Sequence, residues 1–195
     1  LVLLFFYAPI VVLVVNSFNA ARFGGNWEGF TTKWYEKLWA ADDIWAALRT
    51  SLLIATLASL AAMLLGTLAA FALHRFKSRL QKIHLGALTV PLVMPDILTG
   101  ISLLLFFVAI KMPTGLTTIW IAHVTFCLSY VAMVVLGRLQ DFDFTLVDAA
   151  RDLGASRAVA ARKIVLPLLA PGIIAGGLLA FTLSIDDFVI TFFVQ

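Results

Sequence analysis

The sequence predicts an all-α integral membrane protein, a fold class favoured by its composition, its long apolar segments and the placement of its charges. Of its 195 residues, 62% are hydrophobic and only 13% are charged, and the mean hydropathy is +1.02. A soluble domain is nearer half apolar and a quarter charged. A soluble fold of this length cannot bury so much apolar surface, because exposed surface still scales steeply with mass at this size.

Five segments approach or reach the roughly 20 apolar residues that a membrane-spanning helix needs. They are residues 1–15, 50–73, 85–110, 116–136 and 164–185. The first is short and lacks an initiator methionine, so we expect the sequence to be truncated at both ends. The third contains Pro91, Pro95, Asp96 and Gly100. These residues predict a broken or kinked helix of the kind that lines binding cavities in transporters.

The Lys and Arg residues of the connecting loops predict the orientation. Nine of the 14 lie between spans two and three or between spans four and five: Arg75, Lys77, Arg79, Lys82, Arg138, Arg151, Arg157, Arg162 and Lys163. These two loops share one side of the membrane, which the positive-inside rule assigns to the cytoplasm. No basic run is interleaved with aromatic residues, so the net charge of +3 indicates topology rather than a nucleic-acid partner.

The connection over residues 16–49 then faces outward as an external loop. Within it, the pairs Trp34/Leu38 and Tyr35/Trp39 are four residues apart and share one side of a possible helix at residues 32–39. Such a helix would lie among the lipid headgroups, where aromatic rings are favoured. Docking of an outside partner is the alternative interpretation.

The inner loop, residues 138–163, is predicted to be a helix, a sharp turn and a second helix. Thr145 is a candidate cap of the first helix, with Asp148 three residues later. Gly154 suits the left-handed conformation that ends a helix, Ser156 can cap the next, and Pro167 suits a first-turn position. The loop is far longer than the 2 to 8 residues that usually join bundled helices. Its length indicates that something binds it.

The residues of this loop match a family pattern. The sequence reads Asp148-Ala149-Ala150, three residues, Gly154, nine residues, then Ile164-Val165-Leu166-Pro167. It resembles the "EAA" coupling loop of ABC importer permeases, departing only in Asp148 for Glu. The resemblance implies that Asp148, Ala149, Ala150, Gly154, Ile164, Leu166 and Pro167 couple the chain to an ATPase subunit.

The resemblance to spermidine/putrescine permease subunits covers nearly the whole chain, including residues 29–38, 91–105, 121–131 and 179–194. It implies a type I ABC importer transmembrane domain over residues 1–195, with five helices visible of an expected six, in the bacterial inner membrane. The implied partners are a homologous second permease, two ATP-binding subunits and an external polyamine-binding protein. The chain has no Gly-x-x-x-x-Gly-Lys-Ser/Thr phosphate loop. ATP and Mg are therefore expected on the separate ATPase, and this chain is expected to bind no cofactor and to catalyse no reaction.

Three acids are candidates for the substrate path. Counted along a straight helix, Asp96 lies roughly 18 Å from the inner face, close to the midplane. Asp186 and Asp187 end the fifth span near the outer boundary. Buried charges are costly unless they face a cavity or a partner, and carboxylates without nearby bases suit an organic polycation. The alternatives are that Asp96 caps a half-helix after Pro95, and that the Asp186–Asp187 pair is a solvated helix end.

The sequence gives little support for metal binding or for catalysis. His123 is interpreted as a hydrogen-bonded packing residue, with proton relay as the alternative, and Cys127 as a small buried hydrophobe. The three histidines and one cysteine have no metal-ligand spacing. The remaining alternatives are an ABC permease for an amino acid, sulfate or an iron complex, an ion-driven carrier, and a membrane-embedded enzyme.

The predicted orientation can be tested by thiol labelling. A cysteine replacing Ser78 is expected to react with a membrane-impermeant reagent only from the cytoplasmic side, and one replacing Thr114 only from outside. The unchanged chain, which carries Cys127 alone, is the control. The opposite pattern would overturn the orientation.

Overall fold

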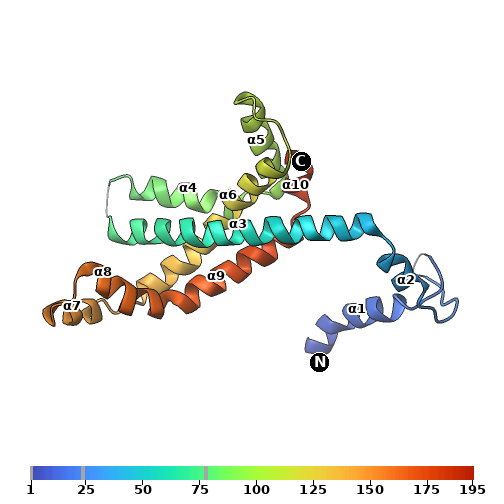
Figure 1. Ribbon diagram of the computed structural model, residues 1–195, viewed down its shortest axis with the longest axis horizontal. Helices are drawn as coiled ribbons and strands as arrows, with labels where there is room; N and C mark the ends of the chain where they lie inside the picture. Colours follow the sequence, from blue (N-terminus) through green and yellow to red (C-terminus); the bar gives the residue numbers. More distant parts are fainter. Residues whose placement is uncertain (1, 23–24, 77–78) are drawn as a thin grey trace. The chain divides into compact units, whose positions relative to one another are not determined.

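The computed structural model describes residues 2–22, 25–76 and 79–195, which are mainly helical (Figure 1). Lys77 and Ser78, in the basic connection between spans two and three, lie outside the described residues. The chain, interpreted above as one permease domain, comprises two compact units, Leu1–Thr50 and Ser51–Gln195. Each unit is described by itself.

The first unit contains α1 (Val2–Asn16), α2 (Lys33–Trp39) and the start of α3 (Asp42–Arg75). The α2 helix confirms the helix predicted at residues 32–39. Buried Asn19 organises the turn between α1 and α2: its side chain donates to the Asn26 carbonyl at 2.8 Å and accepts from the Glu28 N–H at 2.9 Å. The indole N–H of Trp34 donates to the Asn19 carbonyl at 2.8 Å, so α2 is fastened to this turn.

The second unit contains most of the apolar helices. They are α3, α4 (Gln81–Val93), α5 (Asp96–Ala109), α6 (Leu116–Gln140), α9 (Leu166–Asp186) and α10 (Val189–Val194). Three helices are long and apolar enough to cross a membrane, namely α3, α6 and the continuous helix Arg157–Asp186. The pair α4 and α5 meets the same test as one broken span, and α1 is a shorter apolar helix. The predicted apolar segments are thereby confirmed as helices.

Two details of the predicted spans differ in the structure. The second begins at Asp42 rather than at residue 50, because Asp42 and Asp43 supply the negative charge that favours a helix N-terminus. The third is bent by 115° between α4 and α5. Met94 is extended there, and Pro95 has no N–H to continue the helix. The depth of Asp96 was counted along the segment that forms α4 and stays a prediction, because the bend lies directly before Asp96.

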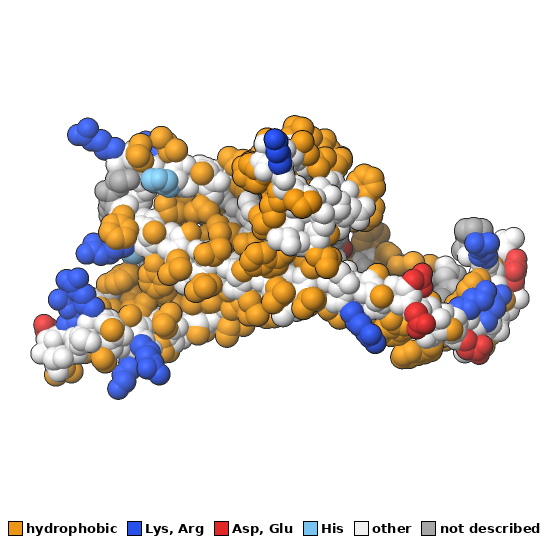
Figure 2. All heavy atoms as spheres, turned by 45° about the horizontal axis from the view of Figure 1, so that its top comes forward, with side chains coloured by type: hydrophobic (Ala, Val, Ile, Leu, Met, Phe, Trp, Pro, Cys, Tyr) orange, Lys and Arg blue, Asp and Glu red, His pale blue; other side chains and the backbone are white. Residues whose placement is uncertain are grey.

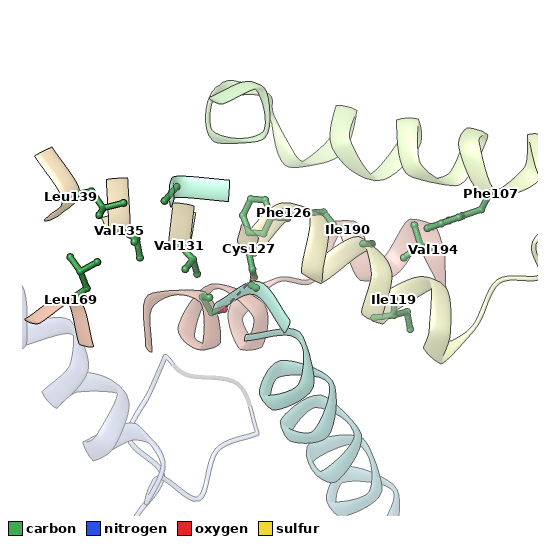
Figure 3. Close-up of a cluster of buried hydrophobic side chains, with 14 of the residues drawn as sticks. Phe107, Ile119, Phe126, Cys127, Val131, Val135, Leu139, Leu169, Ile190 and Val194 are labelled. Atoms are coloured by element: carbon green, nitrogen blue, oxygen red, sulfur yellow. Dashed lines mark hydrogen bonds between the residues drawn. The ribbon is translucent and has the colours of Figure 1, made fainter. Parts of the chain in front are cut away.

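The α6 helix is the centre of the second unit. It has buried side chains along its whole length, from Thr118 to Leu139, and it contacts α9, α10 and α4. Figure 3 shows Leu139, Val135, Val131 and Cys127 in sequence along this helix, with Leu169 of α9 opposite. The Cys127 thiol is buried and donates to the Ala180 carbonyl at 3.4 Å, so the prediction of a small buried residue is confirmed.

The α3 helix packs through a face of small residues that we call the small-residue seam. The seam consists of Ala55, Ala58, Ser59, Ala62, Gly66 and Ala70, all buried. A Cβ on Gly66 would lie 2.9 Å from the Val131 Cβ and 3.0 Å from the Leu128 carbonyl oxygen of α6. Small residues let the backbones of membrane helices approach closely. Such close packing stabilises the contact, because the hydrophobic effect does not drive helices together within lipid.

Candidate functional site

The inner loop is a helical hairpin made of α7 (Thr145–Asp152) and α8 (Arg157–Ala160). Gly154 joins them at φ +89, a conformation that favours glycine. The Gly154 N–H donates to the Arg151 carbonyl at 2.9 Å, and the Ala155 N–H to the Ala150 carbonyl at 3.0 Å. This pair of bonds is a Schellman motif. The predicted helix, glycine turn and second helix are therefore confirmed.

The caps of the hairpin are partly as predicted. Ser156 caps α8 by accepting from the Val159 N–H at 3.3 Å. The predicted Thr145 cap is wrong: Thr145 is the first residue of α7, and Asp143 accepts from its N–H at 2.9 Å. Aspartate side chains often accept from the backbone N–H two residues later, and this local turn precedes α7 in place of a side-chain cap. Hydrogen bonding from the Thr145 side chain and backbone lowers the pKa of the exposed Asp143 carboxyl.

The two sides of α7 differ in what they contact. Val147 packs against the buried core of the second unit. Asp148, Ala149 and Leu146 are exposed, and Leu153 just beyond the helix is 90% exposed. An apolar side chain so exposed has no structural use within the chain itself. The hairpin thus presents an apolar and acidic surface that a partner could cover.

The second half of the loop enters α9 through a π-helical turn, Ala161–Val165. Sequence reasoning did not anticipate this turn, because one wider turn within a continuous helix leaves no periodicity to detect. Ile164 and Val165 are partly or fully buried, Leu166 and Pro167 are exposed, and Pro167 lies in the first turn of α9 as predicted. Single π turns occur often at functional sites.

Asp187 is held by internal hydrogen bonds at the break between α9 and α10. Its carboxylate accepts from the Ile190 N–H at 3.2 Å and the Thr191 N–H at 3.0 Å, and it lies 3.3 Å from Nε2 of His123 on α6. The side chain is 7% exposed. These contacts satisfy the first N–H groups of α10 and leave Asp187 little freedom to contact a solute.

The His123 ring completes this buried polar cluster. Its Nδ1 lies 2.6 Å from the Ser184 hydroxyl, and its Nε2 lies 2.9 Å from the Thr191 hydroxyl. The ring therefore bonds to α9 on one side and to α10 on the other. This geometry confirms the prediction of a hydrogen-bonded packing role for His123.

Asp96 and Asp186 differ from Asp187, because both are exposed and have no hydrogen bond or ion pair within the described part of the chain. Asp96 is the first residue of α5 and makes no side-chain cap, so the capping alternative is not supported. The roles of Asp96 and Asp186 in a substrate path stay predictions.

Comparisons with known proteins place the chain among transporter subunits. Residues 62–195 match the family described as "Binding-protein-dependent transport system inner membrane component". The chain is 45% identical to the spermidine/putrescine transport system permease protein PotC of Escherichia coli (strain K12), covering 97% of this chain and 72% of that protein. It is 47% identical to the putrescine transport system permease protein PotI of the same strain, covering 98% and 70%. Identity to PotC of Haemophilus influenzae is 42%, covering 98% and 74%.

The adjacent acids at the α9–α10 break give a matched test of the buried cluster. Asp187→Ala is expected to lower the free energy of unfolding by about 2–4 kcal/mol, because it removes bonds to His123 and to two backbone N–H groups. Asp186→Ala should change it by no more than about 0.5 kcal/mol, as exposed substitutions usually do. Thermal unfolding in detergent measures both. Equal effects would contradict the distinction.

Proposed function

We propose that this chain is the permease subunit through which an ABC importer carries polyamines. The chain belongs to the family of binding-protein-dependent transport system inner membrane components. The identity to permeases named for spermidine and putrescine, over almost all of this chain, carries the proposal. Alternating access between the two sides of the membrane is the mechanism that such a subunit would use.

The chain needs partners for this work. A homologous second permease would form the other half of the path, two ATP-hydrolysing subunits would bind ATP and Mg, and an external binding protein would deliver the solute. The absence of a phosphate-loop motif between residues 1 and 195 supports the assignment of hydrolysis to another polypeptide.

The α7–α8 hairpin is the proposed attachment for the ATPase. Its exposed face, with Asp148, Ala149 and Leu153, offers a thin apolar surface that a cleft could enclose. The helix from Arg157 continues without a break through the π turn to Asp186. A displacement of the hairpin would therefore be carried along α9 to the α9–α10 break, where Asp186 lies.

A cationic cargo is supported by the charges along the predicted path. Within the described ranges, Asp96 and Asp186 keep unpaired carboxylates, whereas residues 85–110 and 116–136 contain no Lys or Arg. An anion carrier for sulfate would be expected to place bases in these segments.

Uptake by the reconstituted complex tests the proposed function. Proteoliposomes with all partners should accumulate labelled putrescine or spermidine when ATP is supplied inside, and should not accumulate sulfate or a neutral amino acid. Uptake without ATP would indicate an ion-driven carrier instead. Preference for sulfate or an amino acid would contradict the polyamine assignment.

The role of Asp96 can be isolated with Asp96→Asn, which keeps the shape and removes the charge. Polyamine uptake is expected to fall at least tenfold, because a charge-assisted contact contributes about 1.5–3 kcal/mol. Thermal stability should not change, since the Asp96 side chain caps nothing in α5. Asp42→Asn, at an exposed acid of α3, is the control and should transport normally. Normal uptake by Asp96→Asn would remove Asp96 from the path.

The hairpin turn can be tested with a series at Gly154. There is space around a Cβ at this position, so substitutions act only through the backbone at φ +89. Polyamine-stimulated ATP hydrolysis by the complex should fall in the order Gly, Asn, Val, because Asn tolerates the left-handed region and a β-branched residue does not. Equal rates for all three would exclude the hairpin as the coupling element.

A further inference from the structure

A hollow lies beside the α7–α8 hairpin. It has a volume of about 500 Å³ and lies between the end of α3 and the segment from α7 to the start of α9. Three arginines line it, Arg75 from α3, Arg151 from α7 and Arg157 from α8. Apolar residues, including Phe71, Val165 and Leu166, form the rest of the lining. We call it the arginine hollow.

None of the three guanidinium groups forms an ion pair with a described residue. The one ion pair among the described residues joins His123 and Asp187. The acids of α7, Asp148 and Asp152, line a neighbouring hollow with Gly154, and Arg151 lines both hollows. Figure 2 shows Lys and Arg side chains gathered at the end of the second unit that carries α7, α8 and the α3–α4 connection. The lining of the arginine hollow therefore contains three basic side chains and no acid, and the nearest acids, Asp148 and Asp152, lie beside Arg151 on α7.

The apolar part of the lining indicates what kind of anion fits. Phe71 is in the last turns of α3, and Val165 and Leu166 begin the apolar run of α9. In the predicted topology the hollow lies where the second and fifth spans end, with apolar side chains on the spans and arginines at the end of α3 and in the hairpin. A free phosphate would satisfy only the arginines. A phospholipid would satisfy both, because guanidinium groups bind phosphate in a bidentate manner and the acyl chains would cover the apolar residues.

We propose that the arginine hollow binds the headgroup of an anionic phospholipid from the adjacent leaflet, with phosphatidylglycerol as the reference ligand. The bound lipid would join the end of α3 to the hairpin, where no ion pair joins them among the described residues. Basic pockets between membrane helices bind anionic headgroups on this physical basis. The proposal goes beyond the transport function and does not depend on which solute is carried.

Native mass spectrometry of the assembled transporter, titrated with phosphatidylglycerol in detergent, tests the site. The double variant Arg75→Gln/Arg157→Gln should weaken binding about 30-fold, at roughly fivefold for each base removed. The matched control Arg79→Gln/Lys82→Gln removes the same charge from the α3–α4 connection and the first turn of α4, outside the lining, and should weaken binding less than threefold. Equal losses in the two double variants would show general surface attraction and overturn the site.

A second variant keeps every charge and fills the space. Ala161→Phe places a ring in the hollow and should displace phosphatidylglycerol, whereas phosphatidylcholine retention elsewhere on the complex stays constant. Unchanged phosphatidylglycerol binding by Ala161→Phe would overturn the proposal. Displacement of the lipid by equimolar inorganic phosphate would also overturn it, since the acyl chains would then contribute nothing. Loss of ATPase subunits from Arg75→Gln/Arg157→Gln with lipid retained would assign the arginines to the ATPase contact instead.

Discussion

The close approach of α3 to α6 at Gly66 is the constraint on which the rest of the second unit depends. Lipid competes equally for apolar side chains, so membrane helices are held by tight contact rather than by the hydrophobic effect. At Gly66 a Cβ would meet the backbone of Leu128 and Ala132 as well as the Val131 side chain. Gly176 of α9 approaches Val131 from its own side, where a Cβ would lie 3.4 Å from the Val131 Cα. Both helices therefore pack against one position of α6.

This packing connects the two ends of the unit. Near one end the stem of Arg138 on α6 lies over Gly172 of α9, close to the helical hairpin. At the other end His123 of α6 holds the α9–α10 break through Ser184 and Thr191. Because α6 and α9 are in contact along their length, a movement of the hairpin cannot stay local. The geometry agrees with the proposed transmission of force from the hairpin to a solute path.

Much of this arrangement was predictable from local sequence signals. Apolar length predicted the spans, Pro91 and Pro95 predicted the broken helix, and Gly154 and Ser156 predicted the hairpin turn and its second cap. These features depend on residues close together in the chain. The features that were not predicted depend on contacts between residues far apart in the chain, or on which of several neighbouring side chains binds a backbone N–H. The partners of Asp187 come from α6 and α10, and Thr145 lies inside α7, where its N–H donates to Asp143.

The unfolding temperature of Gly66→Ala in the assembled transporter, measured beside Gly137→Ala, tests the central claim most directly. Gly137 is on α6, and a methyl group added there would have nothing within 4 Å, so its substitution should preserve or slightly raise stability. Gly66→Ala must separate α3 from the α6 backbone, and both the unfolding temperature and ATP-driven polyamine uptake should fall clearly. A Gly66→Ala transporter that unfolds and transports like the unchanged protein would contradict the account.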